Sequence, residues 1–388
     1  MKKIGILTYF TDIPYFNDVN PGMDLQAYGV YQALKNQYPN DRIEFIRYHS
    51  WFAIWRIYLS GITFESFFKD CKQFYKYYKF AKKFNLSPKA LVTIDYKKAS
   101  NFINSLGYDA IYVGSDTLLE LFRAPKDEIT AYWLSPEIKA KKFMMAASAR
   151  NASISNLSNI QKEKLQASID GFKTLGIRDN ATYSLIKNFI KEGDDRLEII
   201  PDPTFYFDID YTDADKYAHK NGIANSKKPI VCFHLLKTDS FAQELADIYH
   251  KAGYLIASLR PAKYADFLLK DLSPTEFAGI FKYFKITITH RFHDSVFNIK
   301  NLTPILLYPP SAAYKNENGD SKQSSLVSSF GIKEDNYIED INTLSANEIK
   351  LRADKAIISF NQKKDNIRKQ LEEYKKQLEE YIQKTSFL

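Results

Sequence analysis

The alternation of short apolar runs with helical segments constrains the fold of this 388-residue chain more than any other feature. Residues 3–10 form an apolar run typical of a buried strand, residues 25–37 have the pattern of a helix, and residues 42–48 return as a strand. A strand, a crossover helix and a second strand are typical of a parallel sheet with helices packed on it. We therefore expect an α/β protein.

The same alternation continues to residue 308. Further strands are expected over 109–113, 143–148, 172–178, 197–200, 229–235, 254–259, 285–289 and 304–308. Further helices are expected over 159–171, 181–191, 242–252, 273–283, 294–300 and from 345 to the end. The helix at 273 opens on Ser-Pro-Thr-Glu, a pattern that caps a helix start. Residues 51–105 are expected to be helical, and residues 309–325 to form a mobile loop.

Two prolines within residues 201–204 interrupt the pattern near the middle of the chain. The length and the hydrophobic content of 45% favour two domains, each with its own core. We predict an N-terminal Rossmann-like domain over 1–205, a C-terminal Rossmann-like domain over 206–345 and a helical extension over 346–388. The extension either packs back on the body, remains a solvated end or forms a short coiled coil that would make a homo-oligomer.

Composition excludes several classes of protein. Cys71 and Cys232 form no CxxC pair, which fits a reduced, cytoplasmic protein. No window approaches the ~18 consecutive apolar residues of a membrane-spanning helix. The formal charge of +8 favours an anionic substrate or an anionic membrane face as partner, because no nucleic-acid-binding motif accompanies it.

Residues 66–84 combine lysines with aromatic side chains, and the pattern has two interpretations. The segment either lies on a membrane surface, so that the protein is peripheral at the inner membrane face, or presents a solvated lysine face above an apolar packing face. The second arrangement is the commoner one for a surface helix.

Ligands of open α/β sheets bind at the carboxyl ends of the strands, so the residues directly after each strand are candidate site residues. In this chain they are Asn20, Gly22, Ser115, Asp116, Arg150, Arg178, Arg260, His290, Arg291 and His293, with Lys322 in the loop after the last strand. The cations among them suit an anionic ligand.

Arg291 and His293 lie at a strand-to-helix junction. The free N–H groups of a helix start favour an anion, the Arg adds a planar fork for phosphate or carboxylate, and the His can exchange protons near neutral pH. A capping His beside a surface Arg explains the same residues, and chemistry alone leaves both interpretations open.

His290 and His293 have no third ligand cluster, so we predict no metal. GxxxxGKS, GxGxxG and GxSxG patterns are absent, which argues against NTPases, simple dinucleotide oxidoreductases and nucleophile-elbow hydrolases.

Seven segments in order resemble the polysaccharide pyruvyltransferase family. They are residues 3–10, 22–34, 108–116, 175–188, 201–204, 273–297 and 322–331. The combination of Gly114-Ser-Asp, Ile177-Arg-Asp and Arg291-Phe-His is the most specific part. The resemblance implies a GT-B-like fold of two Rossmann-like domains facing across a cleft, with the C-terminal helix crossing back. It also implies transfer of the enolpyruvyl part of phosphoenolpyruvate to a sugar, whose two hydroxyls become bridged as a pyruvate ketal.

The resemblance assigns roles to individual residues. It makes His293 the catalytic acid/base and Asp116 the residue that orients or deprotonates a sugar hydroxyl. The implied donor-binding residues are Arg178, Arg291 and Lys322, to which their places after strands add Arg260 and His290 as candidates. The implied acceptor-binding residues are Asn20, Gly22, Gln26 and Ser115. Phosphoenolpyruvate is a co-substrate and no further cofactor is expected. The acceptor is expected to be a sugar or lipid-linked oligosaccharide of a cell-surface polysaccharide, such as an exopolysaccharide.

The chain departs from the family pattern at several positions. Thr117 stands where Gln is common, His290 replaces Ser or Thr, and Ala149-Arg150 replaces a Gly-rich turn. Asp294 stands where Gly or Ala is usual, and its carboxylate must turn away from the donor if the donor site is placed correctly. Two alternatives remain: a GT-B glycosyltransferase that uses a nucleotide sugar, and a non-catalytic glycan-binding relative of the enzyme.

Overall fold

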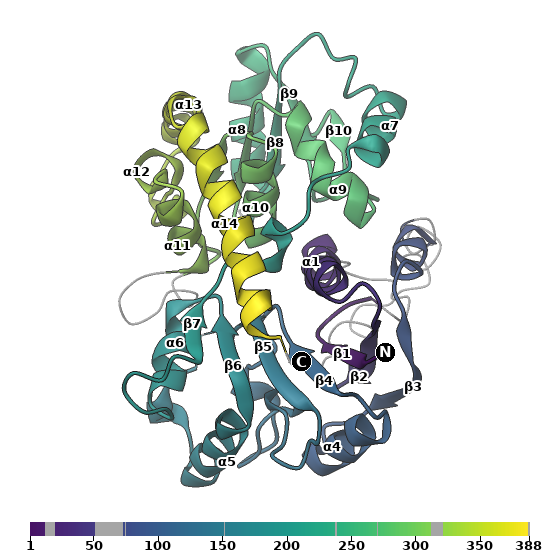
Figure 1. Cartoon of the computed structure of the whole chain (residues 1–388). Helices are drawn as coiled ribbons and strands as arrows, with labels where there is room; N and C mark the ends of the chain where they lie inside the picture. The colour runs from purple at the N-terminus through teal and green to yellow at the C-terminus, as the bar shows by residue number, and fades with distance from the viewer. Residues whose placement is uncertain are drawn as a thin grey trace. The chain divides into compact units, whose positions relative to one another are not determined.

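The computed structural model describes residues 1–11, 20–50, 73, 75–150, 152–236, 239–269, 271–311 and 321–386 (Figure 1). The chain divides into two compact units: unit 1 comprises Met1–Phe207 with Tyr374–Leu388, and unit 2 comprises Asp208–Glu373. The predicted boundary at residue 205 lies near this division. The segment 346–388, predicted as a separate extension, is shared between the two units.

Unit 1 is built on a seven-stranded parallel sheet with strand order β3-β2-β1-β4-β5-β6-β7. Its strands are β1 (Lys3–Leu7), β2 (Arg42–His49), β3 (Leu86–Val92), β4 (Ala110–Val113), β5 (Lys141–Ala147), β6 (Phe172–Ile177) and β7 (Leu197–Ile199). Its main helices are α1 (Pro21–Gln37), α4 (Tyr96–Ser105), α5 (Asn159–Asp170) and α6 (Asn180–Lys187). The central strands are buried apolar runs, as a sheet covered on both faces requires.

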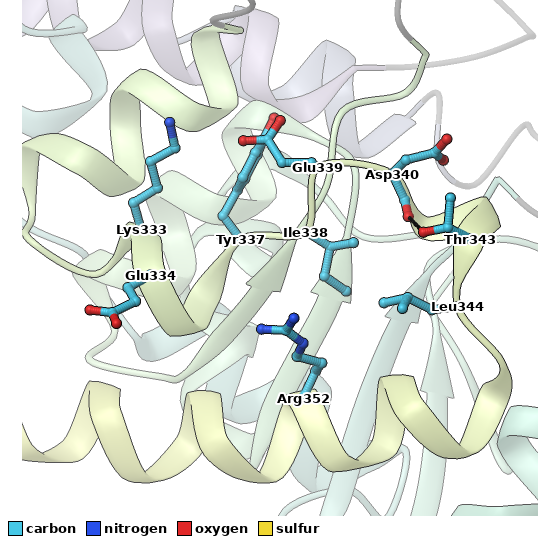
Figure 2. Close-up of a pocket in the computed structure, with 9 residues that line it drawn as sticks. All are labelled: Lys333, Glu334, Tyr337, Ile338, Glu339, Asp340, Thr343, Leu344 and Arg352. Carbon is cyan, nitrogen blue, oxygen red and sulfur yellow. Dashed lines mark hydrogen bonds between the residues drawn. The ribbon is translucent and has the colours of Figure 1, made fainter.

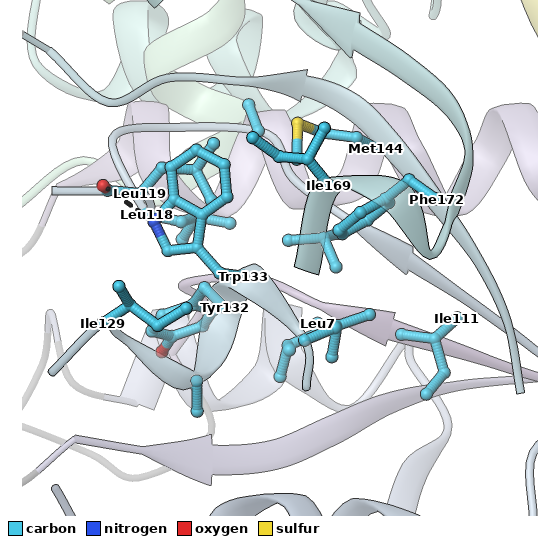
Figure 3. Close-up of a cluster of buried hydrophobic side chains, with 14 of the residues drawn as sticks. Leu7, Ile111, Leu118, Leu119, Ile129, Tyr132, Trp133, Met144, Ile169 and Phe172 are labelled. Atoms are coloured by element: carbon cyan, nitrogen blue, oxygen red, sulfur yellow. Dashed lines mark hydrogen bonds between the residues drawn. The ribbon is translucent and has the colours of Figure 1, made fainter. Parts of the chain in front are cut away.

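One face of this sheet is covered by a large apolar cluster (Figure 3). Trp133 is fully buried in the cluster against Met144, Ile169 and Phe172. Its indole N–H donates to the carbonyl of Leu119 at 3.2 Å, so the one polar atom of the ring is satisfied. This hydrogen bond ties two parts of the segment between β4 and β5 to each other.

The carboxyl end of β7 is fixed against α1. A short 3₁₀ helix, η5 (Pro203–Phe205), follows that strand and approaches Gly29 so closely that a Cβ there would meet the carbonyl of Pro203. Asp202 caps this turn by accepting from the backbone N–H of Thr204 at 3.0 Å and from its hydroxyl at 2.7 Å. The proline pair that interrupts the sequence pattern thus forms a rigid corner beside the strand ends.

Unit 2 contains a five-stranded parallel sheet with strand order β10-β9-β8-β11-β12. Its strands are β8 (Ile230–His234), β9 (Leu255–Ser258), β10 (Phe267–Leu268), β11 (Ile286–Thr289) and β12 (Ile305–Leu307). Its helices are α7 (Thr212–Lys220), α8 (Asp239–Lys251), α9 (Pro274–Ile280), α10 (Phe292–Lys300), α11 (Lys322–Ser329), α12 (Lys333–Asn336) and α13 (Ala346–Gln362). Leu245 of α8 and Ile349 of α13 are fully buried in its main apolar cluster.

The final helix, α14 (Lys364–Lys384), begins in unit 2 and ends in unit 1. Leu378 and Tyr381 are buried to 1% exposure or less. The Tyr381 hydroxyl lies 2.7 Å from Thr174 Oγ1, accepts from the backbone N–H of Gly176 at 2.9 Å and donates to the carbonyl of Met144. Leu378 and Tyr381, whose spacing also fits a coiled coil, are therefore packed within the chain.

The structure bears out the predicted strands, corrects two local expectations and confirms a third. Residues 86–92, expected to be helical, form the strand β3, because Pro88 and the residues after it suit an exposed edge strand. Lys322, expected in a loop, begins α11, which Ser321 caps. Ser273 and Glu276 form the predicted capping box.

The described part of the basic aromatic segment, residues 73 and 75–84, has both exposed and buried aromatics; residues 66–72 and 74 lie outside the described residues. Tyr77, Phe80 and Phe84 are buried, and Phe84 packs on Phe45 of β2 with ring centroids 4.9 Å apart. This agrees with a packing face beneath exposed lysines, and membrane contact stays a prediction. Among the described residues, no helix has the length and apolar character needed to cross a membrane.

Replacing Tyr381 by Phe should destabilise the protein by about 1–3 kcal/mol, because the N–H of Gly176 would be left buried without its acceptor. Chemical denaturation of the variant measures this loss. Glu379→Gln, an exposed change on the same helix, is the matched control and should stay within about 0.5 kcal/mol of the unaltered protein. Equal stability of Tyr381→Phe and the control would show that the hydroxyl does not anchor the helix.

Candidate active site

The polar residues of unit 1 gather at the carboxyl ends of its strands. Arg178, directly after β6, donates to Asp202 Oδ2 at 2.7 Å and to Asp116 Oδ1 at 2.9 Å. Its side chain is 5% exposed, that of Asp202 1% and that of Asp116 15%. The structure therefore brings together three residues that follow three different strands, and only Asp116 keeps an appreciable exposed face.

The charge on Arg178 is balanced inside unit 1. Burial lowers the pKa of the guanidinium, but the carboxylates of Asp116, Asp202 and Asp179 outweigh that effect and the pKa is raised overall. Two carboxylates against one cation leave no excess positive charge for a ligand. This is the geometry of a residue that positions Asp116.

Gln26 holds the turn that carries Ser115 and Asp116. The buried Gln26 amide accepts from the backbone N–H of Ser115 at 3.0 Å and donates to Thr8 Oγ1 and the Tyr9 carbonyl, both at 3.0 Å. Ser115 is likewise fully buried. These two residues, which were expected to bind the acceptor, thus have bonding partners within unit 1.

The other two acceptor candidates, Asn20 and Gly22, lie at the start of α1. Asn20 caps α1 by accepting from the N–H of Gly22 at 3.1 Å. Asn20 is exposed and Gly22 is largely buried. Of the four acceptor candidates, Asn20 therefore has the most accessible side chain.

A second ionic cluster at the same sheet edge was not predicted. The Glu120 side chain is 1% exposed; its Oε2 lies 2.5 Å from Arg123 Nε and its Oε1 lies 3.2 Å from Arg150 Nη1. Arg123 also donates to the Tyr9 hydroxyl at 3.0 Å, and burial raises the pKa of Tyr9 to about 12. The i, i+3 spacing of Glu120 and Arg123 was the available sequence signal. Arg150, a strand-end candidate, is therefore part of an ion pair.

In unit 2 the polar residues gather where β8 and β11 end side by side. The register pairs Thr289 with His234, so the last residues of the two strands are neighbours. His290 is 5% exposed, and its Nδ1 donates to the carbonyl of His234 at 2.8 Å. Gln323 of α11 donates to the carbonyl of His290 at 3.0 Å. The start of α11 is thereby fixed at the junction of β11 and α10.

His290 is held neutral. Burial is the main reason that its pKa falls to about 3, and the neighbouring His234 lowers it further. Its ring centroid lies 5.1 Å from that of His234, with the two ring planes nearly perpendicular. A neutral imidazole whose Nδ1 already donates to a carbonyl suits a positioning role better than that of a cation for the donor.

Asp294 turns its carboxylate inward, as the donor assignment requires. Asp294 Oδ2 lies 2.7 Å from His234 Nδ1 and accepts from Thr289 Oγ1 at 2.6 Å. Burial raises the pKa of this carboxyl, but His234, Thr289 and Arg291 outweigh burial and the pKa is lowered overall. The acidic residue beside the expected anion site is thus ionised and engaged within unit 2.

Three cations lie along this edge of the unit 2 sheet. Arg291 is the exposed N-cap residue of α10, and Lys322 Nζ lies 5.5 Å from the ring centroid of Phe292 on the first turn. Arg260, after β9, is exposed and donates to the carbonyl of Leu235 at 3.3 Å. His293 is half-buried on the same first turn of α10. All five candidate donor and catalytic residues of unit 2, including His290, therefore lie along this edge of its sheet.

The candidate residues lie apart from the surface pocket of unit 2. A surface pocket of about 600 Å³ in unit 2 contains none of the candidate residues (Figure 2). It is lined by Lys333, Glu334, Tyr337, Ile338, Glu339, Asp340, Thr343, Leu344 and Arg352. Within the described ranges, no three His, Cys, Asp or Glu side chains are placed to hold a metal ion.

Comparison with known proteins places the chain in a family. A family model described as polysaccharide pyruvyl transferase matches residues 20–304. Among the curated proteins, none has a matching sequence. Similar solved structures include the E. coli trehalose-6-phosphate structure bound with UDP-2-fluoro glucose, with 10% identity, a TM-score of 0.50 and 99% of each chain covered. They also include the OtsA apo structure, with 9% identity, a TM-score of 0.51 and 100% of each chain covered. These likenesses show the fold: α/β of the GT-B class with two Rossmann-like sheets.

Acidification should weaken the fold through His290. Its pKa is about 3 in the folded protein and about 6.5 in the unfolded chain, so the unfolded chain binds the extra proton between these values. Stability from this residue is complete above pH ~6.5 and is lost as the pH falls toward 3. Lowering the pH from 7.5 to 5 should reduce the free energy of unfolding of the unaltered protein by about 2 kcal/mol more than that of His290→Gln, as measured by denaturant unfolding. Identical pH dependence in both proteins would contradict a buried neutral His290.

Proposed function

Because this chain belongs to the polysaccharide pyruvyl transferase family, we propose that it transfers the pyruvyl group of phosphoenolpyruvate to two hydroxyls of one sugar. The sugar belongs to a cell-surface polysaccharide or its precursor. The reaction forms a cyclic ketal and releases phosphate. The observation that supports this most directly is the junction of β11 and α10, which presents Arg291, His293 and Lys322 together.

Phosphoenolpyruvate suits the charge of this junction. The donor carries a carboxylate and a phosphate, about three negative charges in all, and Arg260, Arg291 and Lys322 are three cations along one edge of unit 2. The first turns of α10 and α11 add backbone N–H groups, which favour anions at helix starts. Arg291 is suited to bind the phosphate or the carboxylate in a planar fork.

The chemistry requires protons to move at defined atoms. Protonation of the methylene carbon C3 makes C2 cationic, and a sugar hydroxyl forms the first C2–O bond. The bond from C2 to the phosphate oxygen then breaks, and a second hydroxyl of the same sugar closes the ketal. We assign the protonation of C3 to His293, which lies beside the proposed donor cations. The cations stabilise the leaving phosphate.

Asp116 is our candidate for orienting the acceptor. It is the carboxylate of the unit 1 cluster with an exposed face, and Arg178 fixes one of its oxygens. A carboxylate in this position can accept hydrogen bonds from sugar hydroxyls. Arg178 is accordingly proposed to position Asp116, and the donor cations are proposed to come from unit 2.

Purified protein incubated with phosphoenolpyruvate and the methyl glycosides of common hexoses should release phosphate. His293→Ala should lower kcat by at least ~100-fold, because the proton donor to C3 would be lost. Phosphate release and ketal formation are measured together by NMR. Full activity of His293→Ala would refute its role, and turnover of a nucleotide sugar instead of phosphoenolpyruvate would favour the glycosyltransferase alternative. Glycan binding without phosphate release would favour the non-catalytic relative.

Arg291→Ala should raise the KM for phosphoenolpyruvate by roughly 10- to 100-fold, because the variant loses one charge-assisted hydrogen bond to the donor. Lys300→Ala removes a cation from the opposite end of the same helix and is the matched control, with little change expected. Initial rates at varied phosphoenolpyruvate concentration give both constants. Equal KM values for the two variants would exclude donor binding at the helix start.

A further inference from the structure

His234 occupies the centre of the unit 2 strand ends, although it was not among the predicted site residues. It is the last residue of β8, next to the end of β11 in the sheet. Its ring lies beside that of His290, and its own backbone carbonyl accepts from His290 Nδ1. The following carbonyl, that of Leu235, accepts from Arg260. His234 therefore lies between His290 and Arg260, at the strand ends where the donor is proposed to bind.

Asp294 fixes the orientation and the tautomer of His234. The distance from Asp294 Oδ2 to His234 Nδ1 is 2.7 Å, and Asp294 is 4% exposed on its side chain. An ionised carboxylate can only accept, so Nδ1 carries the hydrogen and Nε2 of the neutral ring carries the lone pair. Thr289 donates to the same carboxylate oxygen and keeps it in place. The pair has the base-and-orienter arrangement found in nucleophile-activating triads.

The Nε2 side of His234 is available to a ligand. The side chain retains 14% exposure, and within the described residues the hydrogen bond to Asp294 is the one that the ring makes. The charged and titratable groups around it include Asp294 and Arg291 from the α10 side, His290 after β11, Arg260 after β9 and Tyr308 after β12. The neutral, buried His290 cannot supply a proton to the reaction near pH 7.

We propose that His234, oriented by Asp294, is the base that takes the proton from the first attacking sugar hydroxyl. This inference rests on the proposed pyruvyl transfer. In that reaction His293 gives one proton to C3, and His234 Nε2 takes one from the hydroxyl that forms the first C2–O bond. The second hydroxyl loses its proton to the departing phosphate, which leaves as hydrogen phosphate. Exchange with water then returns both histidines to their starting states, so atoms and charge balance.

Two proton-transfer groups are needed because C3 gains a proton while an oxygen loses one. A single histidine would have to serve both atoms in turn, whereas the hydrogen bond from Nδ1 to Asp294 leaves Nε2 of His234 as the ring nitrogen that can take a proton from a hydroxyl. Asp294 is a positioning residue in this scheme, because it reaches the substrate only through His234.

A second His–Asp pair in unit 2 provides a matched control. His250 Nε2 lies 2.9 Å from Asp266 Oδ2, with both side chains about 35% exposed. This pair lies at the end of α8 and directly before β10, which is the amino edge of the same parallel sheet. It has the same pairing chemistry at the end of the sheet opposite to the proposed site.

The test compares the unaltered protein, His234→Gln, Asp294→Asn, the double variant and His250→Gln. The substrates are phosphoenolpyruvate and a methyl hexoside that the unaltered protein converts. His234→Gln should lower kcat by at least ~100-fold with little change in the KM for phosphoenolpyruvate, and one limb of the pH–rate profile should disappear. Asp294→Asn should approach the same loss, since an amide can donate to Nδ1 and reverse the tautomer. The double variant should be no slower than His234→Gln, and His250→Gln should retain full activity.

Each outcome decides the proposal. Losses confined to His234 and Asp294, with unchanged melting temperatures and the altered pH profile, support it. Ketal formation by His234→Gln at the rate of His250→Gln overturns it and leaves the pyruvyl transfer standing. Additive losses in the double variant, or a loss of kcat with an unaltered pH profile, also overturn it, since they indicate a structural pair.

If the unaltered protein converts no acceptor, the proposed function and this inference fail together. If the variants unfold, His234→Asn, which is smaller and keeps an amide donor for Asp294, replaces them with the same criteria.

Discussion

A carboxylate buried at the end of a parallel sheet has to be paired, and both units of this protein are organised around that constraint. Removing an ion from water costs several kcal/mol unless a partner of opposite charge and further hydrogen bonds offset the cost. In unit 1, Asp202 is 1% exposed and is paired with Arg178. In unit 2, Asp294 is 4% exposed and is paired with His234. The pairing with Asp202 fixes Arg178, which in turn holds the partly exposed Asp116. The pairing with Asp294 fixes the partly exposed ring of His234. The buried carboxylates thus hold a partly exposed side chain in place in each unit.

The two units apply the constraint to different chemistry. An arginine is always charged, so the Arg178 pair gives a permanently fixed oxygen on Asp116. A histidine can gain or lose a proton near neutral pH, so the Asp294 pair leaves an imidazole that is oriented and still able to react. The first arrangement suits the holding of hydroxyl groups, and the second suits proton transfer. The departure from the family pattern at Asp294 is therefore explained by its pairing with His234.

Much of this arrangement could be predicted from the sequence. Apolar runs of buried strands and the Ser273 capping box are local signals, and they placed most strands and the strand-end residues Asp116, Arg178, Arg291 and His293. The partners of those residues could not be predicted, because they come from strands far apart in sequence. His234 is 60 residues from Asp294, and its position inside an apolar strand gave it the pattern of a core residue. The edge strand β3 was concealed by the lysine and aromatic bias of its surroundings.

The sequence also does not show whether an arginine is paired within the protein or is exposed to a ligand. Arg178 and Arg291 each follow a strand, yet Arg178 is balanced by two carboxylates while Arg291 is an exposed helix cap. The most direct test of ketal formation follows phosphoenolpyruvate labelled with ¹³C at C2 by NMR in the presence of an acceptor sugar. The label should change from an enol carbon to a saturated ketal carbon as phosphate is released. A label that stays in phosphoenolpyruvate or appears as free pyruvate would contradict pyruvyl transfer by this protein.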